Sequence, residues 1–285
     1  MFGRTIPRDN RPEDEVINEA VKLAKQADVV VAALGESSEM SGEASSRTNL
    51  KIPEVQKRLL QALLKTGKPV VLVLFTGRPL ALKWENENVP AILNVWFGGT
   101  ETANAIPDVL FGAVNPSGKL TATFPQNVGQ VPLYYAHKNT GRPLAEGKWF
   151  TKFRSNYLDP FGYGLSYTSF TYSNLKLSKT SFKSGESITA SIEIKNTGST
   201  AGKEVVQLYI RDLEGSSTRP VKELKGFQKI SLQPGETKTV SFKITEEDLK
   251  FYNTTLKFTA EPGDFHVFIG GNSRDVMETK FTMSY

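Results

Sequence analysis

The side chains best suited to chemistry in this sequence lie in a polar stretch from Gly35 to Pro53. Its three glutamates, Glu36, Glu39 and Glu43, are separated by three and four residues. A carboxyl group can act as a general acid near neutral pH when an apolar pocket raises its pKa. Arg47 could hydrogen-bond a ligand hydroxyl, or it could pair with a neighbouring carboxylate and hold the stretch in shape. The stretch is therefore the first candidate for a functional site.

A solvated acidic surface is the plain alternative for these glutamates. Spacings of three and four would place them on one face of a helix, and exposed charges are the usual case on such a face. Gly35 and Gly42, together with the serines of the stretch, argue against a helix. We therefore expect a loop.

The segment before the loop decides where the loop lies. Asp28 to Leu34 is apolar after its first residue, which predicts a strand buried on both faces within a parallel sheet. The loop then leaves the carboxyl end of a strand, the edge at which open α/β sheets bind ligands. Thr76-Gly77-Arg78 follows another apolar run and is expected at the same edge.

The first part of the chain alternates between strand and helix patterns. A second buried strand is predicted at 69–75 and a third strand at 91–97. Helices are predicted after Pro12 and Pro53 and at about 100–110, where Pro107 should kink or shorten the helix. This order predicts parallel βαβ units. Because no strand pattern precedes the first helix, the α/β domain is expected to lack its front strand.

The second part of the chain changes to a period of two. Alternating segments at 187–195, 205–211, 237–244 and 263–269 are separated by turn signals and predict a β-sandwich. The fold class is thus α/β plus all-β. We expect three regions: an (α/β) sandwich domain at 1–114, an ordered connector packing on the domains at 115–168, and a β-sandwich domain at 169–285.

Composition excludes several classes of function. The chain has no cysteine and two histidines far apart, so a thiolate site, a zinc site or a Ser-His-Asp triad is not expected, and no cofactor is implied. Its 35 basic and 30 acidic residues are interspersed, unlike those of a nucleic-acid-binding surface. No apolar run reaches the length of a membrane span, and the first residues do not resemble a signal peptide.

Several motifs together resemble the carboxy-terminal half of glycoside hydrolase family 3, and in particular periplasmic β-glucosidases. The motifs, in order, are Met40-Ser-Gly-Glu-Ala-Ser-Ser-Arg-Thr-Asn-Leu-Lys-Ile-Pro53, Asn115-Pro-Ser-Gly-Lys-Leu120, Pro160-Phe-Gly-Tyr-Gly-Leu-Ser-Tyr167 and Arg219-Pro-Val-Lys-Glu-Leu-Lys-Gly-Phe227. The resemblance covers nearly the whole chain. It implies a fibronectin type III-like domain at the carboxyl end and a periplasmic or secreted protein.

The resemblance also assigns roles within the polar loop. Glu43 matches the family's acid/base glutamate, with Glu39 or a residue outside this chain as alternatives. Met40, Ser41 and Arg47 fall where the loop would meet the substrate, a terminal β-D-glucosyl residue of a β-glucoside or oligosaccharide. The family's barrel domain and its aspartate nucleophile have no counterpart here, so we expect the chain alone to be inactive.

Two other classes of function stay open at this point. The first is a non-catalytic carbohydrate-binding or interaction module, whose former docking surface for the barrel should have become polar. The second, nucleotide binding by the α/β domain, rests on fold analogy alone. The sequence does not determine whether the chain forms a homodimer.

Overall fold

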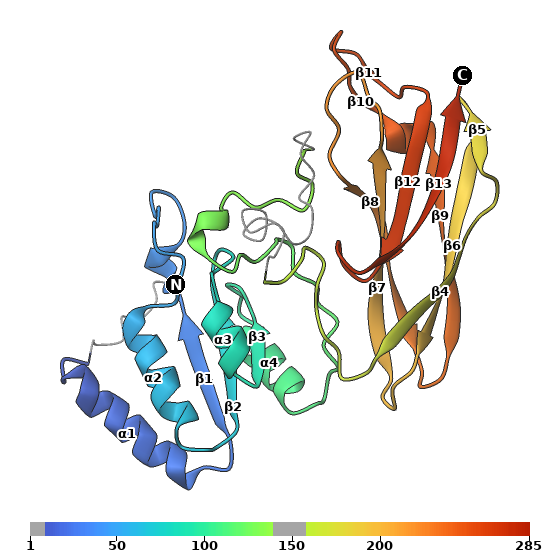
Figure 1. Ribbon diagram of the computed structural model, residues 1–285. Helices are drawn as coiled ribbons and strands as arrows, with labels where there is room; N and C mark the ends of the chain where they lie inside the picture. The colour runs from blue at the N-terminus through green and yellow to red at the C-terminus, as the bar shows by residue number, and fades with distance from the viewer. Residues whose placement is uncertain (1–8, 139–157) are drawn as a thin grey trace. The chain divides into compact units, whose positions relative to one another are not determined.

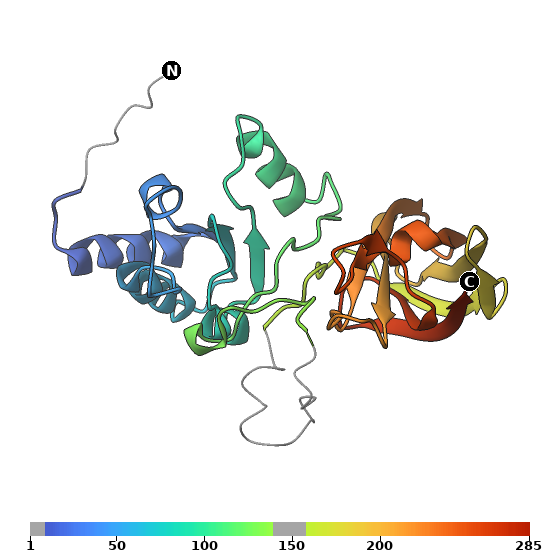
Figure 2. The ribbon, with the colours of Figure 1, turned by 90° about the horizontal axis from the view of Figure 1, so that it is seen from above.

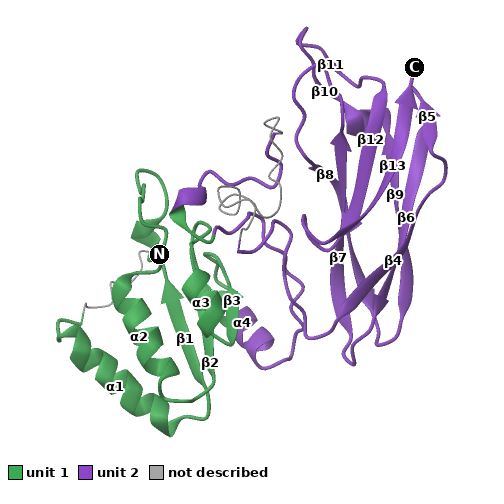
Figure 3. Cartoon of the chain, in the orientation of Figure 1, with its two compact units in different colours: residues 1–103, 126–128 green, residues 104–125, 129–285 purple. Residues whose placement is uncertain are grey.

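The computed structural model describes residues 9–138 and 158–285 and divides the chain into two compact units (Figures 1 and 3). Unit 1 comprises residues 1–103 and 126–128, and unit 2 comprises 104–125 and 129–285. The predicted fold class, α/β followed by all-β, is confirmed. The expected limits of the connector, 115–168, stay a prediction, and its residues 139–157 lie outside the described residues.

Unit 1 is built on a parallel sheet of three strands in the order β1-β2-β3. The strands are β1 (Val30–Gly35), β2 (Val70–Phe75) and β3 (Ala91–Asn94). Parallel pairing confirms the prediction made from the three apolar runs. Strand β2 lies in the middle, and Val70, Leu72, Val73 and Leu74 are almost completely buried there. The carboxyl ends of all three strands therefore meet at one edge of the sheet.

The helices follow the expected order with two differences. They are α1 (Glu13–Gln26), α2 (Glu54–Leu64), α3 (Lys83–Asn88) and α4 (Thr102–Leu110). Helix α3 was not predicted, because a helix of six residues carries too little periodicity to be recognised. Helix α4 runs through Pro107 instead of ending near it. In Figures 1 and 2, α1 lies beside α2, and α2 contacts β1.

The prediction that the first strand is buried on both faces is wrong for this chain. In β1, Ala32 is buried, whereas Val31 is 46% exposed, and Val29, just before the strand, is 44% exposed. The physical reason is position: β1 is an edge strand, and among the described residues nothing covers the face that carries Val31. The apolar character of a run does not show whether its strand lies at the edge or in the middle of a sheet.

The end of β1 depends on a glycine. Gly35 has φ +136°, and a Cβ atom there would overlap the carbonyl oxygen of Phe75 on β2. We expect Gly35→Ala to lower the free energy of unfolding by about 3 kcal/mol, because backbone strain and overlap add. Gly67→Ala is the matched control: Gly67 also has positive φ, +76°, but open space around it. Its expected cost is about 1 kcal/mol. Equal losses in urea titrations of the two variants would contradict the steric argument.

Unit 2 is a β-sandwich. One sheet has the order β5-β13-β12-β7-β8 and the other the order β4-β6-β9, and the two face one another (Figures 1 and 2). The strands are β4 (Phe170–Leu177), β5 (Ser181–Lys183), β6 (Ser187–Asn196), β7 (Gly202–Asp212), β8 (Glu223–Leu232), β9 (Thr237–Thr245), β12 (Gly263–Gly270) and β13 (Val276–Ser284), with a separate hairpin of β10 (Phe251–Tyr252) and β11 (Phe258–Thr259). The period of two predicted β6, β7, β9 and β12. Ile188, Ala190, Ile192 and Ile194, every second residue of β6, are buried in the core between the sheets.

The described parts of the segment before the sandwich contact β7. Tyr135 stacks on Phe161 with ring centroids 4.3 Å apart, and both rings meet the buried Tyr209 edge-on. Lys119 forms an ion pair of 3.1 Å with Glu204. Aromatic rings packed in this way remove a large apolar area from water.

Candidate active site

The polar loop begins where β1 ends and contains little regular structure. A short 3₁₀ turn spans Ser38–Met40. A tight turn follows, closed by a hydrogen bond of 3.2 Å from the amide of Ser45 to the carbonyl of Gly42. Ala44 in this turn has φ +59°, the left-handed region that residues with a Cβ seldom adopt. The turn presents Glu43, so the loop expected from the glycines is the observed conformation.

Glu36 is the buried anchor of this loop. Its side chain has no solvent exposure, and Arg47 donates to its Oε1 at 2.5 Å. Its Oε2 accepts hydrogen bonds from the hydroxyl of Thr76 at 2.8 Å and from the amide of Gly77 at 3.1 Å. The Nε of Arg78 lies 3.1 Å from Oε1. One carboxylate thus joins the loop after β1 to the loop after β2.

The pKa of Glu36 reflects these partners. Burial alone would raise it, but the hydrogen bonds from Arg47, Thr76 and Gly77 and the charge of Arg78 outweigh burial and lower it. Glu36 is therefore ionised at neutral pH. Its role is structural, since every side of the carboxylate faces a donor.

Arg78 fixes the turn that carries Glu43 from both sides. Its Nη2 donates to the carbonyl of Met40 at 2.6 Å and to the carbonyl of Ser45 at 3.1 Å. These two residues flank Glu43 in sequence. A planar guanidinium with several donors suits such a clamp, because it holds two carbonyls at fixed geometry.

The structure brings some of the predicted site residues together at the sheet edge. Ser41 lies against Gly77, and the same small space is bounded by the ring of Phe97, since a Cβ on Gly77 would overlap both side chains. Met40 is half-buried, and Arg47 is held by Glu36 and by the carbonyl of Lys51 at 3.1 Å. Arg47 therefore holds the loop in shape, and its predicted contact with substrate stays a prediction.

Glu43 is exposed, and so is Glu39. Among the residues that the structure describes, neither carboxylate makes a hydrogen bond or an ion pair. Of the three glutamates, Glu36 is committed to the fold, and the other two are available to a ligand. Glu43 differs from Glu39 in lying on the turn clamped by Arg78. The chemistry that this arrangement offers is proton transfer to or from a ligand by an exposed carboxyl group.

Sequence reasoning missed the anchoring role of Glu36 and the part played by Thr76 and Arg78. A usable signal was present, because Thr76-Gly77-Arg78 directly follows the strand beside β1 and was expected at the same edge.

No group of His, Asp and Glu within residues 9–138 and 158–285 could hold a metal ion. No helix in those ranges is long and apolar enough to cross a bilayer.

Comparisons with known proteins define the class of this protein. Residues 6–167 match the Glycosyl hydrolase family 3 C-terminal domain, and residues 204–273 match the Fibronectin type III-like domain. An α/β unit and a β-sandwich with these matches make up the carboxy-terminal portion of a glycoside hydrolase. The chain belongs to glycoside hydrolase family 3, as its motifs predicted.

Individual relatives agree with this assignment. A periplasmic β-glucosidase of Salmonella typhimurium is 53% identical over 290 residues, which include 99% of this chain and 38% of that protein. A β-xylosidase of Formosa agariphila is 46% identical and is matched over 90% of this chain and 35% of its own length. A crystal structure of a β-glucosidase from Listeria innocua in complex with glucose superposes with a TM-score of 0.87 at 43% identity, covering 99% of this chain and 40% of that one. The chain thus spans well under half the length of these relatives.

Proposed function

We propose that this chain is the carboxy-terminal part of a retaining, exo-acting β-glucosidase that hydrolyses terminal β-D-glucosyl residues. In this proposal Glu43 is the acid/base residue, and Met40, Ser41 and Arg47 contact or border the substrate. The nucleophile comes from a barrel domain that this chain does not contain. The observation that carries the proposal is the clamp of Arg78 on the turn of Glu43, which holds an exposed, unpaired carboxyl group at the ligand-binding edge of a parallel sheet.

The proposed mechanism divides the work between two domains. A retaining glycosidase needs two carboxyl groups about 5 to 5.5 Å apart, one acting as nucleophile and one as acid/base. Glu43 would protonate the leaving glycosidic oxygen while the nucleophile attacks, and would then remove a proton from the water that releases glucose. Docking of the barrel would cover Glu43 and supply the apolar surroundings that a general acid requires.

The exposed apolar residues of unit 1 favour this enzyme over a free-standing binding module. Leu23, Val29, Val31 and Phe97 are all exposed. A module that had lost the rest of the enzyme would be expected to carry polar residues there, because exposed apolar surface promotes association. We further propose that the whole protein is periplasmic or secreted, because this chain is similar to a periplasmic β-glucosidase.

Complementation tests the proposal. We expect the purified chain alone to hydrolyse p-nitrophenyl β-glucoside at no measurable rate, because it holds one carboxyl group of the required pair. Mixing it with a separately expressed barrel domain, such as that of the Salmonella relative, should restore hydrolysis. p-Nitrophenyl β-xyloside serves as a second substrate in the same assay, since one relative is a β-xylosidase. Hydrolysis by the isolated chain at the rate of a full-length relative would contradict the proposal, and so would failure of the two parts to associate in size-exclusion chromatography.

A further inference from the structure

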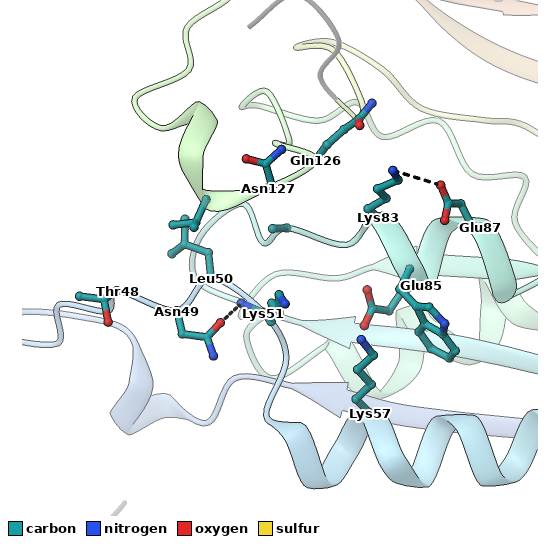
Figure 4. Close-up of a pocket in the computed structure, with 13 residues that line it drawn as sticks. Thr48, Asn49, Leu50, Lys51, Lys57, Lys83, Glu85, Glu87, Gln126 and Asn127 are labelled. Carbon is teal, nitrogen blue, oxygen red and sulfur yellow. Dashed lines mark hydrogen bonds and ion pairs between the residues drawn. The ribbon is translucent and has the colours of Figure 1, made fainter. Parts of the chain in front are cut away.

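Unit 1 contains a pocket that the proposed chemistry does not use. Its volume is about 530 Å³, and neither Glu43 nor Glu36 lines it. Figure 4 shows the pocket between the end of the polar loop, α2, α3 and the segment 126–128. All of the lining residues belong to unit 1. A volume of this size is within the range of small-molecule sites and can hold a monosaccharide.

The basic groups of this pocket are only partly neutralised. Lys83 forms an ion pair of 3.9 Å with Glu87 on the next turn of α3. Lys51 and Lys57 form no ion pair among the described residues. Lys57 lies over the ring of Trp84, with its Nζ 5.2 Å from the centroid. Two ammonium groups without an ion-pair partner at one pocket favour a ligand with a negative charge.

A buried carboxyl group completes the lining. Glu85 is 3% exposed, and burial raises its pKa, although the charges of Lys57 and Lys51 partly oppose this effect. No basic side chain among the described residues comes within ion-pair distance of it. A carboxyl oxygen in this position can accept a hydrogen bond from a ligand hydroxyl. The pocket thus pairs sites for an anion with an acceptor for a polar neutral group.

The remaining wall matches a sugar ring better than a nucleotide. Leu50, Ala81, Trp84 and Val128 offer apolar surface to the flat face of a pyranose, and Asn49, Gln126 and Asn127 add amide groups to the lining. No glycine lines the pocket, whereas phosphate chains are usually cradled by glycine-rich backbone. The idea of nucleotide binding by this domain finds no support in the pocket.

We propose that this pocket is a binding site for an anionic sugar, a pyranose that carries one carboxylate or phosphate. Lys51 and Lys57 hold the anion, the ring lies against Trp84, and Glu85 accepts a hydrogen bond from a hydroxyl. The site is separate from the proposed acid/base residue. Binding to it can therefore be measured on this chain without an assay of hydrolysis.

Ligand-observed NMR titration of the 285-residue chain tests this site without any assay of hydrolysis. D-Glucuronate and glucose 6-phosphate are the probes, and which of them binds more tightly identifies the anion. We expect saturable binding of at least one probe and binding of glucose weaker by about tenfold or more, since hydrogen bonds to charged groups are the stronger ones. Lys57→Met and Lys51→Met, which remove the charge and keep most of the length of the side chain, should each weaken binding of the better probe by about tenfold.

Lys22→Met is the matched control, because Lys22 is an exposed lysine of α1 outside the pocket, and this variant should bind as the unchanged chain does. Circular dichroism of each variant checks that the fold is intact. Glucose binding as tightly as both probes, no saturable binding, or an equal effect of Lys22→Met would overturn the proposal. So would ATP binding more tightly than either probe.

Discussion

Replacing Glu36 with glutamine is expected to lower the free energy of unfolding of unit 1 by about 3 kcal/mol, although the two side chains have almost the same shape. The substitution leaves the guanidinium groups of Arg47 and Arg78, whose side chains are only 19% and 23% exposed, without their shared carboxylate. Removing one partner of a buried ion pair costs more than the pair itself contributes, because the remaining charge stays desolvated. Urea unfolding followed by tryptophan fluorescence measures the loss, since two of the three tryptophans, Trp84 and Trp96, belong to unit 1.

Glu39→Gln is the matched control, because Glu39 is an exposed glutamate of the same loop. It should change the free energy of unfolding by less than about 0.5 kcal/mol.

The dependence of stability on pH gives a second test. The pKa of Glu36 is below its ordinary value of 4.5 in the folded chain, so its stabilising contribution is complete above pH 4.5 and is lost as pH falls through the folded pKa. The difference between the unchanged chain and Glu36→Gln should therefore shrink in acid. Equal losses for the two variants at pH 7 would contradict the anchoring role.

The fold could be predicted because its signals are local and repeated. Three apolar runs predicted β1, β2 and β3, and a period of two predicted four strands of the sandwich. What the sequence could not indicate was burial that depends on neighbours. The apolar run of β1 carries no mark that one face, with Val31, is uncovered in this chain.

The position of the polar loop at the sheet edge could be predicted from the sequence, but the different roles of its three glutamates could not. Glu36, Glu39 and Glu43 are equivalent by composition and spacing. Only the three-dimensional neighbourhood separates them. Thr76, Gly77 and Arg78 come from a loop about 40 residues further along the chain, and of the three glutamate side chains they contact that of Glu36 alone. The pocket around Glu85 was missed for a similar reason, because its walls come from four segments that are far apart in the sequence.

The largest effect on catalysis is expected from Glu43→Ala in the complex of this chain with a barrel domain. For a substrate with a poor leaving group, such as cellobiose, turnover should fall by about 10²- to 10⁴-fold, the usual contribution of general acid–base catalysis. For 2,4-dinitrophenyl β-glucoside the loss in the first chemical step should be much smaller, because this leaving group departs without a proton. The dependence of the loss on the leaving group, measured over a series of aryl β-glucosides, therefore identifies proton donation as the function of Glu43.

The second half of the reaction separates Glu43 from the other exposed glutamate. Without a general base the glycosyl-enzyme accumulates, and azide, a nucleophile that needs no base, should restore turnover and yield β-glucosyl azide. Glu39→Ala is the control and should retain activity with every substrate. If Glu39→Ala instead shows the leaving-group dependence and azide rescue, Glu39 is the acid/base residue. The turn clamped by Arg78 then serves only to shape the loop. Arg78 holds the carbonyls of Met40 and Ser45, which lie on both sides of Glu43, whereas Glu39 has such a held carbonyl on one side only, so the geometry favours Glu43.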